Sequence, residues 1–276
     1  MRHDLATART TKIRLATPSG VLPAQVIEPT NTSDLPPLVV LHGISRNAAE
    51  LVNLFLPEAV RTGRKIVVPH FEAREWPVFQ RPCGKTRPDQ ALLALLARLA
   101  DRDPAFAGRV DLFGHSGGAQ LAHRFAMIFP QKVARLNLAA AGWYCLPDTS
   151  MPYPYGLGAD ATRDSLTWAR RHDQMLTSYL RLSVRVFVGT EDTGRDDSLR
   201  KTPQLDHIQG PTRLARAQTY VARFQSAALA RGLQPDVTLT RLPGVTHDVA
   251  QAIRQADLAR LVTDDWPSPC HAAQAV

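Results

Sequence analysis

Three short segments contain, in chain order, a serine, a group of acids and a histidine that together suit nucleophilic catalysis. The first is Gly-His-Ser-Gly-Gly at 114–118, which fits the pattern G-x-S-x-G around Ser116. The second is "VFVGTEDTGRDD" at 186–197, and the third is "LPGVTHDVA" at 242–250, which contains His247. A serine hydroxyl is a weak nucleophile near neutral pH, so this chemistry needs a histidine base that a carboxylate orients.

The surroundings of Ser116 favour a nucleophile on a sharp turn. The mainly apolar run Val110-Asp111-Leu112-Phe113 predicts a strand before it, and a helical pattern follows directly. Glycines suit such a turn, because side chains at 114 or 118 would obstruct the close approach of strand and helix. The plain alternative is that Ser116 only caps the helix that follows.

The acid of the triad is expected in the loop after the strand at 184–189. Four acids lie in that loop, Glu191, Asp192, Asp196 and Asp197. We favour Asp192, because the carboxylate must stay close to the strand end to reach the imidazole Nδ1. The other three remain alternatives.

His247 is the expected base, since the order serine, acid, histidine is the one that this arrangement requires. Asp248 begins a segment, Asp248-Val249-Ala250-Gln251, that reads as a capping box for the last helix and leaves His247 in the loop before it. An ordinary surface histidine is the alternative. The backbone N–H groups of Ile44 and Gly117 are the expected oxyanion donors.

Strand-like and helix-like patterns alternate along the chain. An N-terminal hairpin is predicted around Pro18-Ser19-Gly20. Further strands are predicted at 37–43, 65–71, 110–113, 133–142, 184–189 and 236–244, and helices at 46–62, 88–100, 163–180, 212–232 and 249–262. This alternation predicts an α/β domain over 1–276, with a mostly parallel sheet of about eight strands covered by helices on both faces. The segment 147–182 is a small insertion, either a pocket rim or an ordinary surface crossover.

Composition excludes several other classes. The hydrophobic share of 44% and charged share of 21% are those of a globular protein. The net charge of +8 comes from basic residues spread along the chain without a block, so no nucleic-acid partner is expected. Cys83, Cys145 and Cys270 are too few and too scattered for a disulfide framework or a zinc site. No apolar run approaches the ~20 residues of a membrane span, and no signal-peptide pattern is seen, so a cytoplasmic location is expected.

The segments "LVVLHG", "GHSGG", "GTED" and "GVTHD", in this order, resemble those of the α/β-hydrolase fold superfamily over about residues 20–262. "VVLHG", "DLFGHSGG" and "AAAGWY" are also similar to bacterial esterases of the polyhydroxyalkanoate-depolymerase and feruloyl-esterase-like type. The resemblance implies that Ser116 attacks an acyl carbonyl, His247 transfers the proton and Asp192 orients His247. It implies no metal or organic cofactor.

The expected function is hydrolysis of small-molecule carboxylic esters with small or medium acyl groups. Candidate pocket walls are His115, Trp143, Tyr144 and Trp76, each of which could equally be a packing residue. Acyl transfer or peptide hydrolysis on the same triad is an alternative, and so is a non-catalytic ligand-binding member of the fold. The sequence does not indicate the oligomeric state.

Overall fold

The computed structural model describes residues 7–83, 86–158 and 163–264. Cys270 lies outside these ranges, whereas Cys83 and Cys145 are free thiols within them. Strands are β1 (Ala8–Thr17), β2 (Gly20–Pro29), β3 (Leu38–Leu41), β4 (Ile66–Pro69), β5 (Val110–His115), β6 (Val133–Ala139), β7 (Ser183–Gly189) and β8 (Val237–Leu242). Helices are α1 (Ala48–Thr62), α2 (Pro88–Ala100), α3 (Gly117–Ile128), α4 (Arg163–Gln174), α5 (Leu176–Tyr179), α6 (Pro203–Gln209), α7 (Arg213–Leu229), α8 (Val249–Ala256) and α9 (Leu258–Thr263).

Within the described residues, eight strands form one sheet in the order β1-β2-β4-β3-β5-β6-β7-β8. The hairpin β1–β2 is antiparallel, as predicted, and β2 also pairs antiparallel with β4. From β4 to β8 every neighbouring pair is parallel. The predicted mostly parallel sheet of about eight strands is therefore confirmed.

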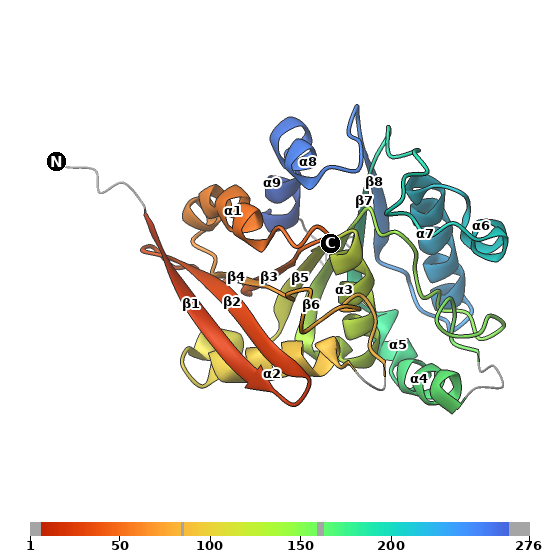
Figure 1. Cartoon of the computed structure of the whole chain (residues 1–276), viewed down its shortest axis with the longest axis horizontal. Helices are drawn as coiled ribbons and strands as arrows, with labels where there is room; N and C mark the ends of the chain where they lie inside the picture. Colours follow the sequence, from red (N-terminus) through yellow and green to blue (C-terminus); the bar gives the residue numbers. More distant parts are fainter. Residues whose placement is uncertain (1–6, 84–85, 159–162, 265–276) are drawn as a thin grey trace, which may run out of the picture.

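Helices cover both faces of the sheet (Figure 1). Side chains of the central strands alternate between two hydrophobic clusters, because successive residues of a strand point to opposite faces. In β3, for example, Val39 and Leu41 join the cluster that includes residues of α2, α3 and α7. Leu38 and Val40 join the cluster that includes residues of α1, α8 and α9. Strands buried on both faces explain the continuous apolar runs in the sequence.

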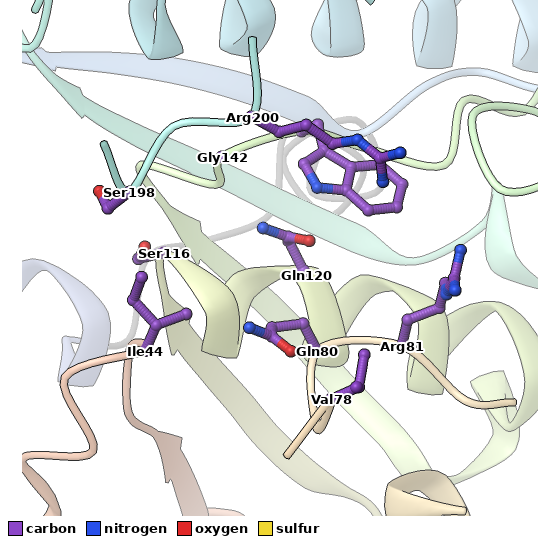
Figure 2. A pocket seen from close by; sticks show the side chains of 10 residues that line it. Ile44, Val78, Gln80, Arg81, Ser116, Gln120, Gly142, Ser198 and Arg200 are labelled. Atoms are coloured by element: carbon purple, nitrogen blue, oxygen red, sulfur yellow. The ribbon is translucent and has the colours of Figure 1, made fainter. Parts of the chain in front are cut away.

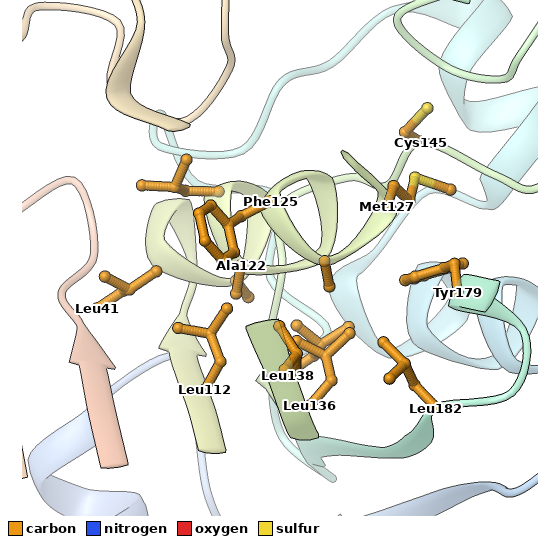
Figure 3. Packing of buried hydrophobic residues seen from close by; sticks show 14 of the residues in the cluster. Leu41, Leu112, Ala122, Phe125, Met127, Leu136, Leu138, Cys145, Tyr179 and Leu182 are labelled. Carbon is orange, nitrogen blue, oxygen red and sulfur yellow. The ribbon is translucent and has the colours of Figure 1, made fainter. Parts of the chain in front are cut away.

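Helix α3, which follows Ser116, packs over the middle of the sheet. Figure 3 shows Ala122 and Phe125 of this helix facing Leu41, Leu112 and Leu136 on three strands. All five side chains have essentially no exposed surface. The N-terminus of α3 is therefore held firmly against the ends of the central strands.

Two predicted helices are divided in the structure. The helix expected at 249–262 consists of α8 and α9, because Asp257 between them adopts a left-handed conformation with φ of 52°. The helix expected near 163–180 is interrupted at Met175 and forms α4 and α5. The sequence did not indicate the short helix α6. Most of the predicted insertion precedes β7 as irregular chain plus these two helices.

None of the helices within 7–83, 86–158 and 163–264 has the length and apolar character that crossing a bilayer needs. The same residues contain no cluster of three or more His, Cys, Asp or Glu side chains arranged to bind a metal ion.

Candidate active site

Four loops meet at the carboxyl edge of the parallel sheet. Ser116 follows β5, Asp192 follows β7, His247 follows β8 and Ile44 follows β3. Because parallel strands end at the same edge, residues more than a hundred positions apart in sequence are brought together there. The sheet thus explains why the three sequence segments converge.

Ser116 occupies a strained turn between β5 and α3. Its φ of 53° and ψ of −114° are unusual for a residue other than glycine. A side chain at Gly118 would overlap the carbonyl oxygen of Leu41 and come within 2.6 Å of that of His42. A side chain at Gly114 would overlap the backbone of Gly118. These glycines allow the close approach of strand and helix that the sequence predicted, and the strain holds the serine above the sheet edge.

Ser116, His247 and Asp192 form a continuous hydrogen-bonded line. The Ser116 Oγ lies 3.0 Å from Nε2 of His247, and Nδ1 of His247 lies 2.9 Å from Oδ2 of Asp192. Since a carboxylate only accepts, Nδ1–H donates to Asp192 and Nε2 is free to accept the serine proton. Ser116 and Asp192 are almost fully buried, whereas 21% of the His247 side chain is exposed.

Of the four candidate acids, all within the described residues, Asp192 alone contacts His247. Glu191 accepts a hydrogen bond from the neighbouring Thr190, and Asp197 pairs with Lys201. Asp196 instead binds Arg213, whose guanidinium holds the pKa of this carboxyl below its usual value.

Arg213 also supports Asp192 directly. Its side chain is 1% exposed, and Nη1 lies 3.3 Å from Oδ1 of Asp192, the oxygen that does not face His247. Nη2 donates to Oγ of Ser198 at 2.6 Å. The guanidinium therefore connects Asp192, at the start of the loop after β7, with Asp196 and Ser198 further along that loop. No sequence motif marks Arg213, since it lies 21 residues from Asp192.

The loops after β7 and β8 are joined through their backbones. The N–H of Glu191 donates to the carbonyl of Val245 at 3.0 Å, and Thr190 N–H donates to that of Leu242 at 2.9 Å. Asp248 caps α8 as predicted, accepting from Gln251 N–H at 2.9 Å. The prediction of a complete capping box is wrong, because the Gln251 side chain accepts from the N–H of Thr246 and not from the N–H of Asp248. That bond fixes the residue beside the histidine.

Ile44 and Gly117, the predicted oxyanion donors, lie close to each other near Ser116. A side chain at Gly117 would come within 2.9 Å of Cγ2 of Ile44, which shows how closely these two residues approach. In the described part of the chain neither N–H has a hydrogen-bond acceptor. Both are therefore available to a ligand.

His42 holds the loop that carries Ile44. Its Nε2 accepts from Phe71 N–H at 3.0 Å, so its Nδ1 carries the proton and donates to the carbonyl of Gly43 at 2.8 Å. Burial lowers the pKa of His42 to about 4, which keeps the ring neutral. It is therefore a structural hydrogen-bonding residue.

A cavity of about 230 Å³ opens beside Ser116 (Figure 2). The residues that line it are Ile44, Val78, Gln80, Arg81, Ser116, Gln120, Gly142, Trp143, Ser198 and Arg200. The lining is thus polar on several sides. The sequence did not indicate Gln80, Arg81, Gln120 or Arg200 as pocket residues, because they lie in segments far apart in the chain and form no motif.

Of the four residues predicted as pocket walls, one lines the cavity, one packs against His247 and two lie in the core. Trp143 lines the cavity, and the buried ring of His115 stacks on that of His247 with centroids 5.0 Å apart. Burial lowers the pKa of His115 well below its usual value, so this ring is neutral. Trp76 and Tyr144 do not line the cavity. Both are fully buried, with Trp76 donating to the carbonyl of Val21 and Tyr144 packed within the core.

Comparison with solved structures identifies the fold. No family model and no curated protein matches the chain. Among solved structures, poly(aspartic acid) hydrolase-1 from Sphingomonas sp. KT-1 is similar with a TM-score of 0.76 and 22% identity, covering 94% of this chain and 99% of that one. The poly(3-hydroxybutyrate) depolymerase LpqC from Bordetella parapertussis has a TM-score of 0.76 and 27% identity, covering 98% and 95%. An S-formylglutathione hydrolase from Agrobacterium tumefaciens has a TM-score of 0.60 and 17% identity, covering 93% and 95%. The chain has the α/β-hydrolase fold.

Proposed function

We propose that this chain is a serine hydrolase that cleaves carboxylic esters of small or medium acyl groups, with Ser116, His247 and Asp192 as its triad. The observation that carries the proposal is the line of hydrogen bonds from Asp192 through His247 to Ser116, at 2.9 Å and 3.0 Å. It ends at a serine that opens into a cavity. Such a line is the arrangement that activates a serine hydroxyl for acyl transfer.

Acylation follows from this geometry. The Ser116 Oγ attacks the ester carbonyl carbon while its proton passes to Nε2 of His247, and the carbonyl π electrons move to the oxygen. The N–H groups of Ile44 and Gly117 stabilise that oxyanion. Asp192 stabilises the imidazolium through Nδ1–H. When the C–O bond to the alcohol breaks, His247 returns the proton to the departing alcohol.

Deacylation repeats these steps with water. The water gives a proton to His247 and attacks the acyl carbon, and the bond to Ser116 Oγ then breaks. Oγ takes the proton back, and the carboxylic acid leaves. The two half-reactions together consume one ester and one water and produce one acid and one alcohol.

One further observation supports a substrate of modest size, and another supports an ester bond. The cavity of about 230 Å³ is smaller than the about 300–1,000 Å³ typical of sites for drug-sized ligands. The similar depolymerase is named for poly(3-hydroxybutyrate), which is a polyester.

A panel of p-nitrophenyl esters tests the proposal. We expect wild type to hydrolyse the acetate and butyrate faster than the palmitate, and Ser116→Ala to lose about three or more powers of ten in kcat. Ser226→Ala is the matched control, since Ser226 is an exposed serine of α7 whose hydroxyl bonds only the Ala222 carbonyl among the described residues. Full activity in Ser116→Ala would contradict the proposal.

The alternatives predict different results in the same panel. A peptidase would cleave the matching p-nitroanilide at a comparable rate, and an acyltransferase would release a new ester when an alcohol acceptor is added. A non-catalytic ligand-binding protein would release no p-nitrophenol above the level of Ser116→Ala.

A further inference from the structure

The cavity beside Ser116 has a cationic end. In Figure 2, Ser116 and Ile44 lie on one side of the view, the guanidinium groups of Arg81 and Arg200 lie on the other, and Gln120 lies between them. Arg81 is half-buried and Arg200 is exposed. Both side chains line the same cavity as the serine.

Neither guanidinium is paired with a carboxylate among residues 7–83, 86–158 and 163–264. In the described part of the chain, the side chains of Arg81 and Arg200 make no hydrogen bond or ion pair; Arg200 accepts one from Arg216 only through its backbone carbonyl. Arg200 lies against aromatic rings instead, 5.7 Å from the ring centre of Trp143 and 5.5 Å from that of Tyr155. The nearby Arg216, in contrast, pairs with Asp206 at 2.8 Å. The charges at the cavity are therefore available to a ligand.

Arg124 adds a third charge behind the cavity wall. It is fully buried, and its guanidinium lies 4.3 Å from the ring centre of Trp143. Nη1 donates to the backbone carbonyl of Gln120 at 2.8 Å, but among the described residues no carboxylate pairs with it. A buried cation without a carboxylate partner is costly and makes the potential in the adjoining cavity more positive. An anionic ligand would offset that cost.

Gln120 supplies a second, independent feature that indicates a polar ligand. Its residue is only 7% exposed, and its side-chain amide lines the cavity. Within the described residues this amide has no hydrogen-bond partner. A side-chain amide that faces a cavity and has no partner in the protein is available to hydrogen-bond a polar atom of a ligand. A purely apolar acyl chain would offer the Gln120 amide no hydrogen-bond partner.

We propose that the preferred substrate is an ester that carries a second, free carboxylate, which Arg81 and Arg200 bind while the ester carbonyl lies at Ser116. This assignment rests on the ester hydrolysis proposed above. Guanidinium groups bind carboxylates through short, charge-assisted hydrogen bonds, and Gln120 lies where it can bind the chain between the two ends. The substrate class is a half-ester of a dicarboxylic acid or an acyl ester of a hydroxy acid, which share this carboxylate.

Matched substrate pairs test the proposal by pH-stat titration. For the acyl side, monomethyl glutarate is compared with the neutral methyl pentanoate. For the alcohol side, 3-acetoxypropanoate is compared with propyl acetate. We expect kcat/KM to be about tenfold or more higher for the charged member of at least one pair, and the preference to shrink as salt is added. The pair that shows the preference identifies which side of the ester faces the arginines.

Variants then connect the preference to the arginines. Arg81→Gln and Arg200→Gln should each lower the ratio of kcat/KM for the charged over the neutral ester by about tenfold. Arg98→Gln removes the same charge from an exposed position on α2 and should leave the ratio unchanged. As a second readout, glutarate should inhibit p-nitrophenyl acetate hydrolysis competitively in wild type and more weakly in both cavity variants.

Two outcomes would overturn this inference. One is equal kcat/KM for both members of each pair, and the other is an unchanged ratio in Arg81→Gln and Arg200→Gln. If neutral esters are still hydrolysed in a Ser116-dependent way, the esterase function stands and only the substrate class is wrong. If no ester is hydrolysed by wild type, the proposed function itself fails.

Discussion

Replacing Asp192 with asparagine should place the histidine proton on the wrong nitrogen. The carboxylate of Asp192 accepts at both ends, from His247 Nδ1–H at 2.9 Å and from Arg213 Nη1 at 3.3 Å. An asparagine has only one accepting oxygen. Since the Arg213 guanidinium only donates, it will hold that oxygen and turn the amide NH₂ toward His247. Nδ1 must then accept, so Nε2 carries the proton and cannot take one from Ser116.

The expected decrease in kcat follows from this loss of the general base. The same exchange in a serine protease lowers kcat by about 10⁴, equivalent to about 5 kcal/mol of transition-state stabilisation. We expect Asp192→Asn to lose about that factor in kcat for p-nitrophenyl acetate, with little change in KM. The matched control is Glu191→Gln, because Glu191 is exposed and, among the described residues, its carboxylate hydrogen-bonds only Thr190. It should keep kcat within about twofold of wild type.

The reverse result would refute this reasoning. If Asp192→Asn keeps most of its activity while Glu191→Gln loses more, the acid is the neighbouring glutamate. If both variants are fully active, the histidine does not depend on an orienting carboxylate. Circular dichroism and the urea midpoint of each variant must match wild type for the comparison to count.

Three other predictions follow from the positioning of the site and from its buried histidines. Gly118→Ala should lower the free energy of unfolding by about 3 kcal/mol or more, seen as a lower urea midpoint, because the new methyl overlaps backbone at the end of β3. Gly108→Ala, which meets nothing within 4 Å, should not. Arg213→Lys should lower kcat about tenfold with KM nearly unchanged, because one ammonium cannot replace a guanidinium bonded to three side chains. Burial lowers the pKa of His42 and His172 from 6.5 to about 4, so the unfolded chain binds protons there first as the pH falls. Stability should therefore fall between pH 6.5 and 4, by about 1 kcal/mol per pH unit for each histidine, and a constant urea midpoint over this range would contradict the assignment.

The order of strands and helices was largely predictable because its signals are local. Buried parallel strands are short apolar runs, and helices such as α2 begin at a proline and continue with leucines. The break between α8 and α9 was not predictable, because it depends on a left-handed Asp257 that no residue type requires. The interruption at Met175 has no local signal either.

The expected site residues were identifiable to different degrees. Ser116 and His247 stand in short segments whose residue types suit a strand-to-helix turn and a loop before a helix. The choice among four acids depended on distance to the strand end, which favours Asp192 but excludes none of the others. Arg213 supports Asp192, and the cavity has a cationic end, because the fold brings distant segments together. No local sequence pattern predicts such contacts. Trp76 and Tyr144 were predicted as pocket walls but pack in the core, because the sequence does not distinguish an aromatic residue of the core from one that lines a pocket.

The central claim is that Ser116 is the nucleophile activated by His247. The most direct measurement is intact mass spectrometry after treatment with a fluorophosphonate, followed by peptide mapping. We expect one adduct on the peptide that contains Ser116 in wild type, none in Ser116→Ala and normal labelling in Ser226→Ala. An adduct that persists in Ser116→Ala, or a wild-type protein that is not labelled, would contradict it.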